Sequence, residues 1–110
     1  MLKYKIQVMW EGKIRVEEVE GERCQSPAGF EDVEFFYHHP GIVDKIYARE
    51  LWRISEVITG KSLTEYYITK AEARKELSDK LLYKSPGMLK VILEANKLPI
   101  EVGRCLHLNG

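Results

Sequence analysis

The segment from Trp52 to Tyr83, WRISEVITGKSLTEYYITKAEARKELSDKLLY, constrains the fold most strongly because it predicts a strand, a tight turn, a second strand and a helix in succession. Thr69 and Glu72, three residues apart, are typical of a capping box, in which a hydroxyl and a carboxylate satisfy free N–H groups at a helix start. The helix that follows carries apolar residues at helical spacing: Ala73, Leu77 and Leu81. The segment therefore predicts a sheet with a helix packed on it.

A first hairpin is predicted near the N-terminus, where apolar and polar residues alternate in LKYKIQVMW and a second run, KIRVEEVE, follows after a turn. A three-residue loop of residues 10–12 would place Val8 opposite Ile14 and Ile6 opposite Val16. A two-residue loop would instead mix apolar and polar side chains on both faces. The pattern therefore favours the three-residue loop, with its glycine in the left-handed region.

The same construction is predicted for the second hairpin, since WEGK and ITGK share a glycine followed by a lysine. With residues 58–60 as the loop, Trp52 would lie opposite Tyr66 and Ile54 opposite Thr64.

A further strand is predicted between the two hairpins, where Val33, Phe35 and Tyr37 alternate and Pro40 with its following glycine ends the run. Residues 42–50 have helical spacing of apolar side chains, but the segment is short, and helix and structured loop both stay open.

A second helix is predicted from Ser85, with Pro86 in its first turn, to about Asn96. Its apolar residues cover most sides: Met88, Leu89, Val91, Ile92, Leu93 and Ala95. Such a helix must be buried on most sides, so either the domain wraps it or a second subunit covers one flank. The tail of residues 100–108 would add an edge strand. Residues 1–110 thus predict a single α+β domain, a mainly antiparallel sheet of about five strands with two C-terminal helices packed on one face.

Composition narrows the classes of function. The 17 Lys and Arg residues balance 17 Asp and Glu residues, which removes the commonest electrostatic argument for nucleic-acid binding. The N-terminal residues lack the continuous apolar region of a signal peptide, so we expect a cytoplasmic protein with reduced cysteines. Acidic residues between Glu17 and Glu34 face only Arg23, which indicates either a solvated loop or an acidic patch for a basic partner.

Ligand-type residues are few, and catalytic motifs for nucleophile elbows, phosphate loops or dinucleotides are missing, so we expect no enzyme and no cofactor. Cys24 beside Arg23 would be the one candidate nucleophile, since a neighbouring cation lowers a thiol pKa. A zinc site is the alternative use of the sulfur and imidazole groups, although their spacing fits none of the familiar paired patterns. Its ligands would be Cys24, His39, Cys105 and His107.

Aromatic residues on the middle strand occupy both of its faces. Phe36 and His38, on the face opposite Phe35, either lie beneath a helix or loop or form an exposed binding patch. We predict an interaction surface made of these two residues together with Met88, Val91, Ile92 and Ala95 of the second helix.

The segment from residue 52 to 76 resembles a module found in small uncharacterised proteins of phages and integrative elements. The residues that carry this likeness are Trp52, Ile54, Ser55, Glu56, Thr59, Gly60, Thr69, Lys70, Glu72 and Ala73. The resemblance implies shared architecture and a mobile-element origin, and it brings no activity.

The helix TKAEARKELSDKLL also resembles the last helix of double-stranded RNA-binding domains, whose lysines grip phosphates. That resemblance implies a basic face made of Lys70, Arg74 and Lys75, and Lys61 would add to this face. The sequence as a whole favours a small non-enzymatic interaction or regulatory protein that acts by binding another protein. A homodimer formed through residues 86–96 is one form that we expect this binding to take. Nucleic-acid binding through the basic face is the alternative, and zinc binding is the second alternative.

Overall fold

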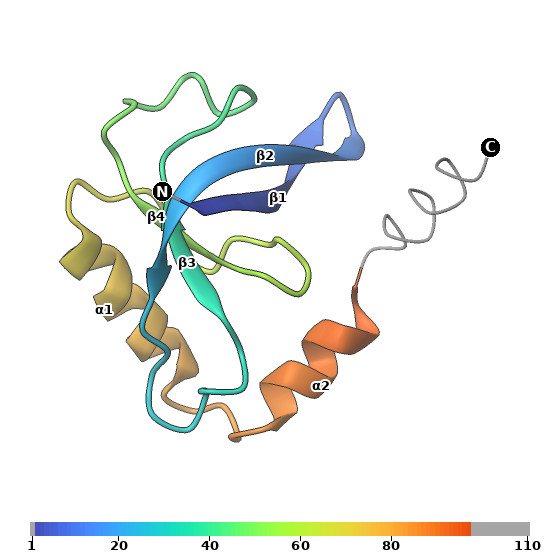
Figure 1. Ribbon diagram of the computed structural model, residues 1–110, viewed down its shortest axis with the longest axis vertical. Helices are drawn as coiled ribbons and strands as arrows, with labels where there is room; N and C mark the ends of the chain where they lie inside the picture. Colours follow the sequence, from blue (N-terminus) through green and yellow to red (C-terminus); the bar gives the residue numbers. More distant parts are fainter. Residues whose placement is uncertain (1, 98–110) are drawn as a thin grey trace.

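The computed structural model describes residues 2–97 and confirms the α+β class (Figure 1). The elements, in chain order, are β1 (Leu2–Trp10), β2 (Lys13–Cys24), β3 (Phe35–His38), β4 (Arg53–Glu56), α1 (Lys70–Leu81) and α2 (Met88–Ala95). Within residues 2–97, four strands form one curled antiparallel sheet in the order β1-β2-β3-β4, compared with the predicted number of about five. The expected edge strand at 100–108 lies outside the described residues.

The predicted register of the first hairpin is wrong by one residue, because β1 and β2 are joined by a two-residue loop. Val8 lies opposite Arg15. Glu11 and Gly12 both have positive φ, 50° and 75°, as a type I′ turn requires, and this turn matches the right-handed twist of the strands. The parity argument fails because it assumed that the apolar residues of both strands lie on the buried face, whereas Ile14 and its partner Met9 are exposed.

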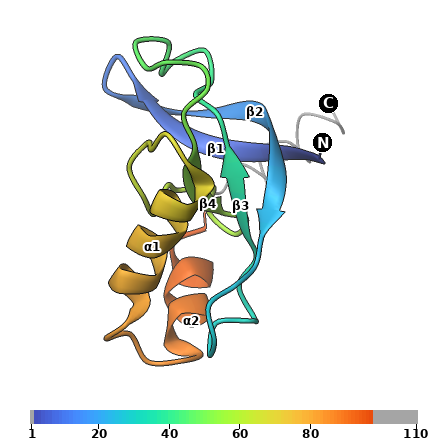
Figure 2. The ribbon, with the colours of Figure 1, turned by 90° about the vertical axis from the view of Figure 1, so that its left-hand side faces the viewer.

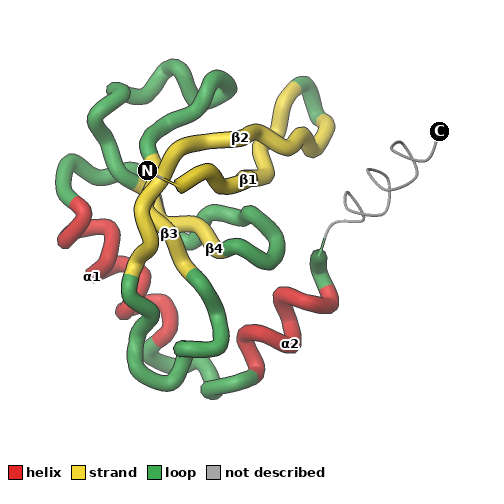
Figure 3. The backbone as a smooth tube through the Cα atoms, in the orientation of Figure 1, coloured by secondary structure: helices red, strands yellow, loops and turns green. Residues whose placement is uncertain are grey.

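The predicted second hairpin is reduced to two isolated bridges, Trp52 with Tyr67 and Ser55 with Ser62. No continuous strand follows β4 within residues 57–69, which form loops (Figure 3). The expected pairing of Trp52 with Tyr66 is therefore wrong. The hydroxyl of Thr64 instead accepts a hydrogen bond from the main chain of β4, at 3.0 Å from the nitrogen of Ile54.

A buried carboxylate explains why this hairpin departs from the predicted three-residue loop. Glu56 is fully buried, and its side chain accepts hydrogen bonds from the main-chain nitrogen of Thr59, at 3.0 Å, and from the Thr59 hydroxyl. The N–H of Gly60 donates to the carbonyl of Glu56 at 2.9 Å, and Gly60 has the predicted positive φ of 73°. Periodicity does not report such side-chain bonds to the main chain.

The sheet curls at Gly21, where β2 changes partners. β2 pairs with β1 up to Gly21 and with β3 from Gly21 to Cys24. A Cβ atom on Gly21 would lie 2.4 Å from the carbonyl oxygen of Tyr37, so only glycine allows this approach. The curl brings Tyr4 of β1 onto Phe36 of β3, with parallel rings 4.0 Å apart.

The predicted middle strand is confirmed as β3, and its alternation divides the interior into two cores. Phe35 faces the helices and Phe36 faces the inside of the curled sheet. The helix-side core contains Cys24, Phe30, Val33, Phe35, Ile54, Ala73, Leu77, Leu81, Leu89 and Leu93. The sheet-interior core contains Tyr4, Ile6, Val8, Val19 and Phe36. Both helices therefore pack on one face of the sheet, while the β1–β2 half curls over the other (Figure 2).

The predicted start of α1 is confirmed, and the predicted start of α2 is wrong. The cap of α1 is confirmed, since the Thr69 hydroxyl accepts from the N–H of Glu72 at 3.2 Å, and the predicted apolar stripe is buried. α2 begins at Met88, three residues later than predicted, because Gly87 adopts the left-handed region with φ 84° and breaks the turn after Pro86. Residues 42–50 form turns. No helix within residues 2–97 is long and apolar enough to cross a membrane.

Candidate protein-interaction surface

Helix α2 buries one side and leaves a second apolar side open to solvent. Leu89 and Leu93 belong to the helix-side core. Met88, Val91 and Ile92 are 52%, 60% and 49% exposed. At about 100° per residue, this exposed group is centred roughly 130° around the helix from the buried leucines. Residues 2–97 therefore cover one side of the helix and do not wrap it, contrary to the first of the two predicted alternatives; cover by a second subunit stays a prediction.

We call the exposed side the α2 patch, made of Met88, Val91, Ile92 and Ala95. These residues follow the spacing i, i+3, i+4, i+7, so they form one continuous stripe. Lys90 and Glu94 lie away from the stripe, centred roughly 150° and 110° around the helix from its middle. The patch is thus an apolar stripe that contains no charged residue of α2.

The predicted contribution of Phe36 and His38 to the surface is wrong. These side chains are 0% and 1% exposed: Phe36 packs with the buried residues of β1 and β2, and His38 lies beside Ser55 of β4 and the Tyr66 ring of the loop after β4. Burial lowers the pKa of His38 to about 4, so its ring is neutral near pH 7. The sequence did not reveal that the sheet itself covers Phe36.

A buried histidine–serine pair was missed in the sequence. His38 Nδ1 lies 3.0 Å from the carbonyl oxygen of His39, which can only accept, so Nδ1 carries the proton. His38 Nε2 then accepts from the Ser55 hydroxyl at 2.8 Å. This is the arrangement of a base and a nucleophile, but both side chains are buried beyond the reach of a substrate. The pair stabilises the junction of β3 and β4.

The predicted basic face does not gather free positive charge. The Lys70 ammonium group pairs with Glu22 and lies 4.5 Å from the centre of the Trp52 ring. Arg74 Nε donates to a main-chain carbonyl of the loop after β2, at 3.1 Å. Lys75 pairs with Asp79 at 3.2 Å.

The fourth member of that face, Lys61, lies in the loop after β4 and is exposed. Internal contacts therefore engage the three basic residues on α1. Nucleic-acid binding through this face stays a prediction.

The structure separates the candidate metal ligands. Cys24 lies opposite Phe35 at one end of β3, and His39 follows the other end. Four residues of extended strand span about 13 Å, so Cys24 and His39 cannot bind one ion. Within residues 2–97 no group of three metal-ligating side chains occurs. Cys105 and His107 lie outside the described residues.

Cys24 is also a poor nucleophile. Its thiol is buried and unpaired in a disulfide, and burial raises the pKa of the thiol more than the nearby Arg74 guanidinium lowers it. The acidic stretch from Glu17 to Glu34 is strand up to Cys24, contrary to the expected loop, and loop over residues 25–34. Its Glu17 carboxylate accepts main-chain N–H groups of Ile42 and Val43, at 2.7 and 3.2 Å, and so anchors the loop after β3.

Comparison with known proteins gives no further evidence on the function of this surface. No family model, curated protein or solved structure matches the chain. The resemblance to mobile-element proteins stays a prediction, and the argument for function rests on the surface.

Proposed function

We propose that this protein is a small non-enzymatic interaction protein, and that the α2 patch is the surface by which two copies bind each other. The observation that carries the proposal is the half exposure of Met88, Val91 and Ile92 on one helix face. Single exposed apolar residues are ordinary on protein surfaces, whereas a continuous stripe is typical of an interface. Covering the remaining half of each side chain would contribute about 1 kcal/mol.

The symmetry of the α2 patch favours a second copy as the occupant. Two α2 helices packed antiparallel about a two-fold axis between Val91 and Ile92 would bring the apolar stripes of both copies together. Met88 of one copy would then lie opposite Ala95 of the other, and Val91 opposite Ile92. The charged residues of α2, Lys90 and Glu94, lie outside the stripe and do not enter this contact. The patch is therefore complementary to itself.

The size of the patch sets the expected strength. α2 has 8 residues and is therefore about 12 Å long. A pair of such helices buries much less than the roughly 1,200 Å² of a stable interface. We therefore expect a concentration-dependent dimer with a dissociation constant of about 100 µM or above.

Sedimentation velocity between about 10 µM and 1 mM tests the proposal, because a dimer of this strength forms across that range. Ile92→Lys places a charge in the middle of the stripe and should leave a monomer throughout. Ile46→Lys is the matched control, since Ile46 is exposed in the loop between β3 and β4. It should dimerise as the unchanged protein does. A monomer at the highest concentration of the unchanged protein would refute the proposal.

The same proposal includes a cytoplasmic location and an origin in a mobile element. The N-terminal strand residues support the first, since they alternate lysine with apolar residues. The segment from residue 52 to 76 supports the second. Immunofluorescence or fractionation of the native host would test the location directly.

A further inference from the structure

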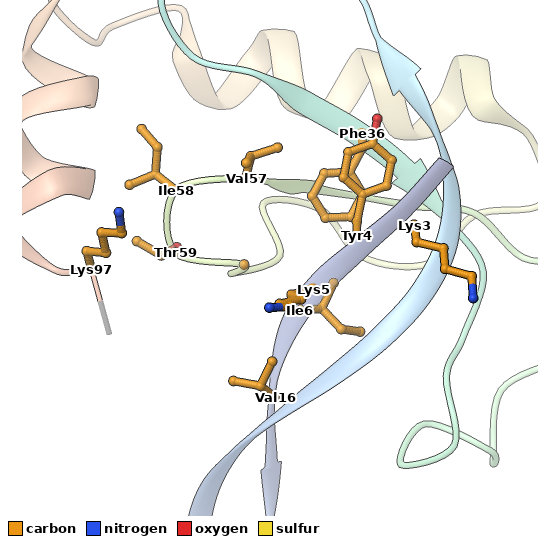
Figure 4. Close-up of a pocket in the computed structure, with 11 residues that line it drawn as sticks. Lys3, Tyr4, Lys5, Ile6, Val16, Phe36, Val57, Ile58, Thr59 and Lys97 are labelled. Atoms are coloured by element: carbon orange, nitrogen blue, oxygen red, sulfur yellow. The ribbon is translucent and has the colours of Figure 1, made fainter. Parts of the chain in front are cut away.

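A groove lies between the edge of β1 and the loop that follows β4 (Figure 4). Its cavity measures about 270 Å³, enough for one large apolar side chain. Tyr4, Phe36 and Ile58 give it apolar walls, while Lys3, Lys5 and Lys97 surround it. No aspartate or glutamate of residues 2–97 lines the groove. The groove is therefore apolar inside and positively charged at its rim.

The main chain of β1 is open along this groove. Within residues 2–97, the main-chain bond that β1 makes on this side is the one from the N–H of Gln7 to the carbonyl of Gly60, at 2.8 Å. Because N–H and C=O groups alternate in direction along a strand, those of Lys3 and Lys5 point to the same side as those of Gln7. They face the groove, and no main-chain group of residues 2–97 pairs with them there.

Within residues 2–97, the loop after β4 approaches the main chain of β1 at Gly60. Gly60 approaches so closely that a Cβ atom there would lie 2.8 Å from the carbonyl oxygen of Lys5. Gln7 adds a side-chain bond to the carbonyl of Thr59 at 2.9 Å. Beyond this contact, no strand of residues 2–97 pairs with this edge of the first residues of β1, which lies beside the cavity.

We propose that this groove binds an extended segment of another protein as an added strand beside β1, and that the segment alternates acidic and apolar residues. Residues of an added strand share a face with the residues opposite them. Those opposite Lys3 and Lys5 would meet ammonium groups and are expected to be acidic. The residue between them, opposite Tyr4, would enter the cavity and is expected to be apolar. Main-chain hydrogen bonds to β1 would supply affinity and the alternation would supply specificity.

Charge excludes a second copy of this chain as the occupant. An antiparallel pairing of two β1 edges would set Lys3 of one copy against Lys5 of the other, and like charges opposite each other oppose pairing. Within the chain, Lys3 already contacts Glu18 at 3.6 Å, with both side chains largely exposed. Exposed pairs of this kind are weak, so an acidic ligand can compete for the lysine.

Fluorescence anisotropy with the full chain tests the proposal, using a labelled peptide of alternating glutamate and isoleucine as the probe. The alternating peptide should bind, and a peptide with the same residues in two blocks should bind at least about fivefold more weakly. Methylation of the central main-chain nitrogens of the peptide should weaken binding similarly, since strand addition needs those donors. Equal binding of all three peptides, or no binding at about 1 mM, would overturn the proposal.

Charge reversal in the protein gives the second readout. Lys5→Glu should weaken binding of the alternating peptide by about tenfold or more, and added salt should weaken binding to the unchanged protein. Lys13→Glu is the matched control, because Lys13 is exposed at the far end of the hairpin and does not line the groove. Equal loss in both variants would contradict the groove as the site. The Ile92→Lys variant should bind the peptide as the unchanged protein does. The test of the groove is therefore independent of the test of the α2 dimer.

Discussion

The two helices of this protein pack on the same core but differ in how much of their surface that core covers. α1 has 12 residues, and its apolar stripe of Ala73, Leu77 and Leu81 is entirely buried. α2 has 8 residues, and its apolar arc extends well beyond Leu89 and Leu93. The charged residues of α1 are engaged by neighbours, whereas the apolar residues of the α2 patch have no cover in residues 2–97.

The comparison shows that the exposed apolar area of a helix, and not its charge, identifies the surface that is open to a partner. A sheet face can cover about one side of a helix, so an apolar arc of roughly 200° leaves a part uncovered. The basic residues of α1 suggested a binding face, yet Glu22 and Asp79 compensate two of them. The experiments below probe this contrast, in order of decreasing effect.

Leu77→Ala should cause the largest loss of stability, about 3 kcal/mol, because Leu77 is completely buried against the sheet and its removal leaves a cavity. Leu82→Ala, one residue beyond α1 and exposed, should change the free energy of unfolding by less than about 0.5 kcal/mol. Urea denaturation measures both. Similar losses for the two variants would mean that α1 is not held as the structure shows.

Acid should weaken the sheet on which both helices rest. The pKa of His38 falls from 6.5 to about 4 on burial, so the unfolded chain binds more protons between these values. The stability that neutral His38 supports is complete above about pH 6.5 and is lost as the pH falls toward 4. The loss should be about 2 to 3 kcal/mol. His38→Asn should flatten this part of the pH profile measured by urea denaturation; an unchanged slope would assign it to other groups.

Within α2, neighbouring substitutions should separate stability from association. Leu93→Ala should cost about 2 kcal/mol of folding stability because it removes a buried side chain. Ile92→Ala should cost less than about 0.5 kcal/mol, yet weaken the dimer. Paired urea and sedimentation measurements would show whether the two sides of α2 have these different roles. Equal destabilisation by both would contradict an exposed patch.

The start of α1 provides a smaller effect. Thr69→Ala should destabilise the protein by about 1 kcal/mol, because the N–H of Glu72 loses its acceptor. Thr69→Ser keeps the hydroxyl and should cost clearly less. Association should be unchanged in both variants, since the cap lies on the covered helix. Thermal unfolding at fixed concentration measures the difference.

The sequence predicted features that depend on local chemistry. The cap at Thr69 and the stripe that ends at Leu81 identified α1, and the alternation around Phe35 identified β3. The apolar excess of α2 was visible too. The helix start was misplaced because the left-handed Gly87 was not expected to end the turn after Pro86.

Features that depend on long-range contacts were beyond sequence patterns. The curl at Gly21 buries Phe36 beneath Tyr4 of β1. The Glu56 carboxylate closes the loop at Thr59 with bonds that periodicity does not report. For the candidate surface, composition gave the apolar residues of α2, and only the packing showed which of them remain exposed.

Replacement of two apolar residues of the α2 patch by opposite charges tests self-association most directly. Val91→Glu and Ile92→Lys should each prevent dimerisation, because a charge enters the apolar contact without a partner. In the double variant each introduced carboxylate would lie opposite an introduced ammonium group of the second copy, so dimerisation should return in sedimentation velocity. A double variant that stays as monomeric as the single variants would contradict an antiparallel pairing of α2 helices, and so would single variants that dimerise as the unchanged protein does.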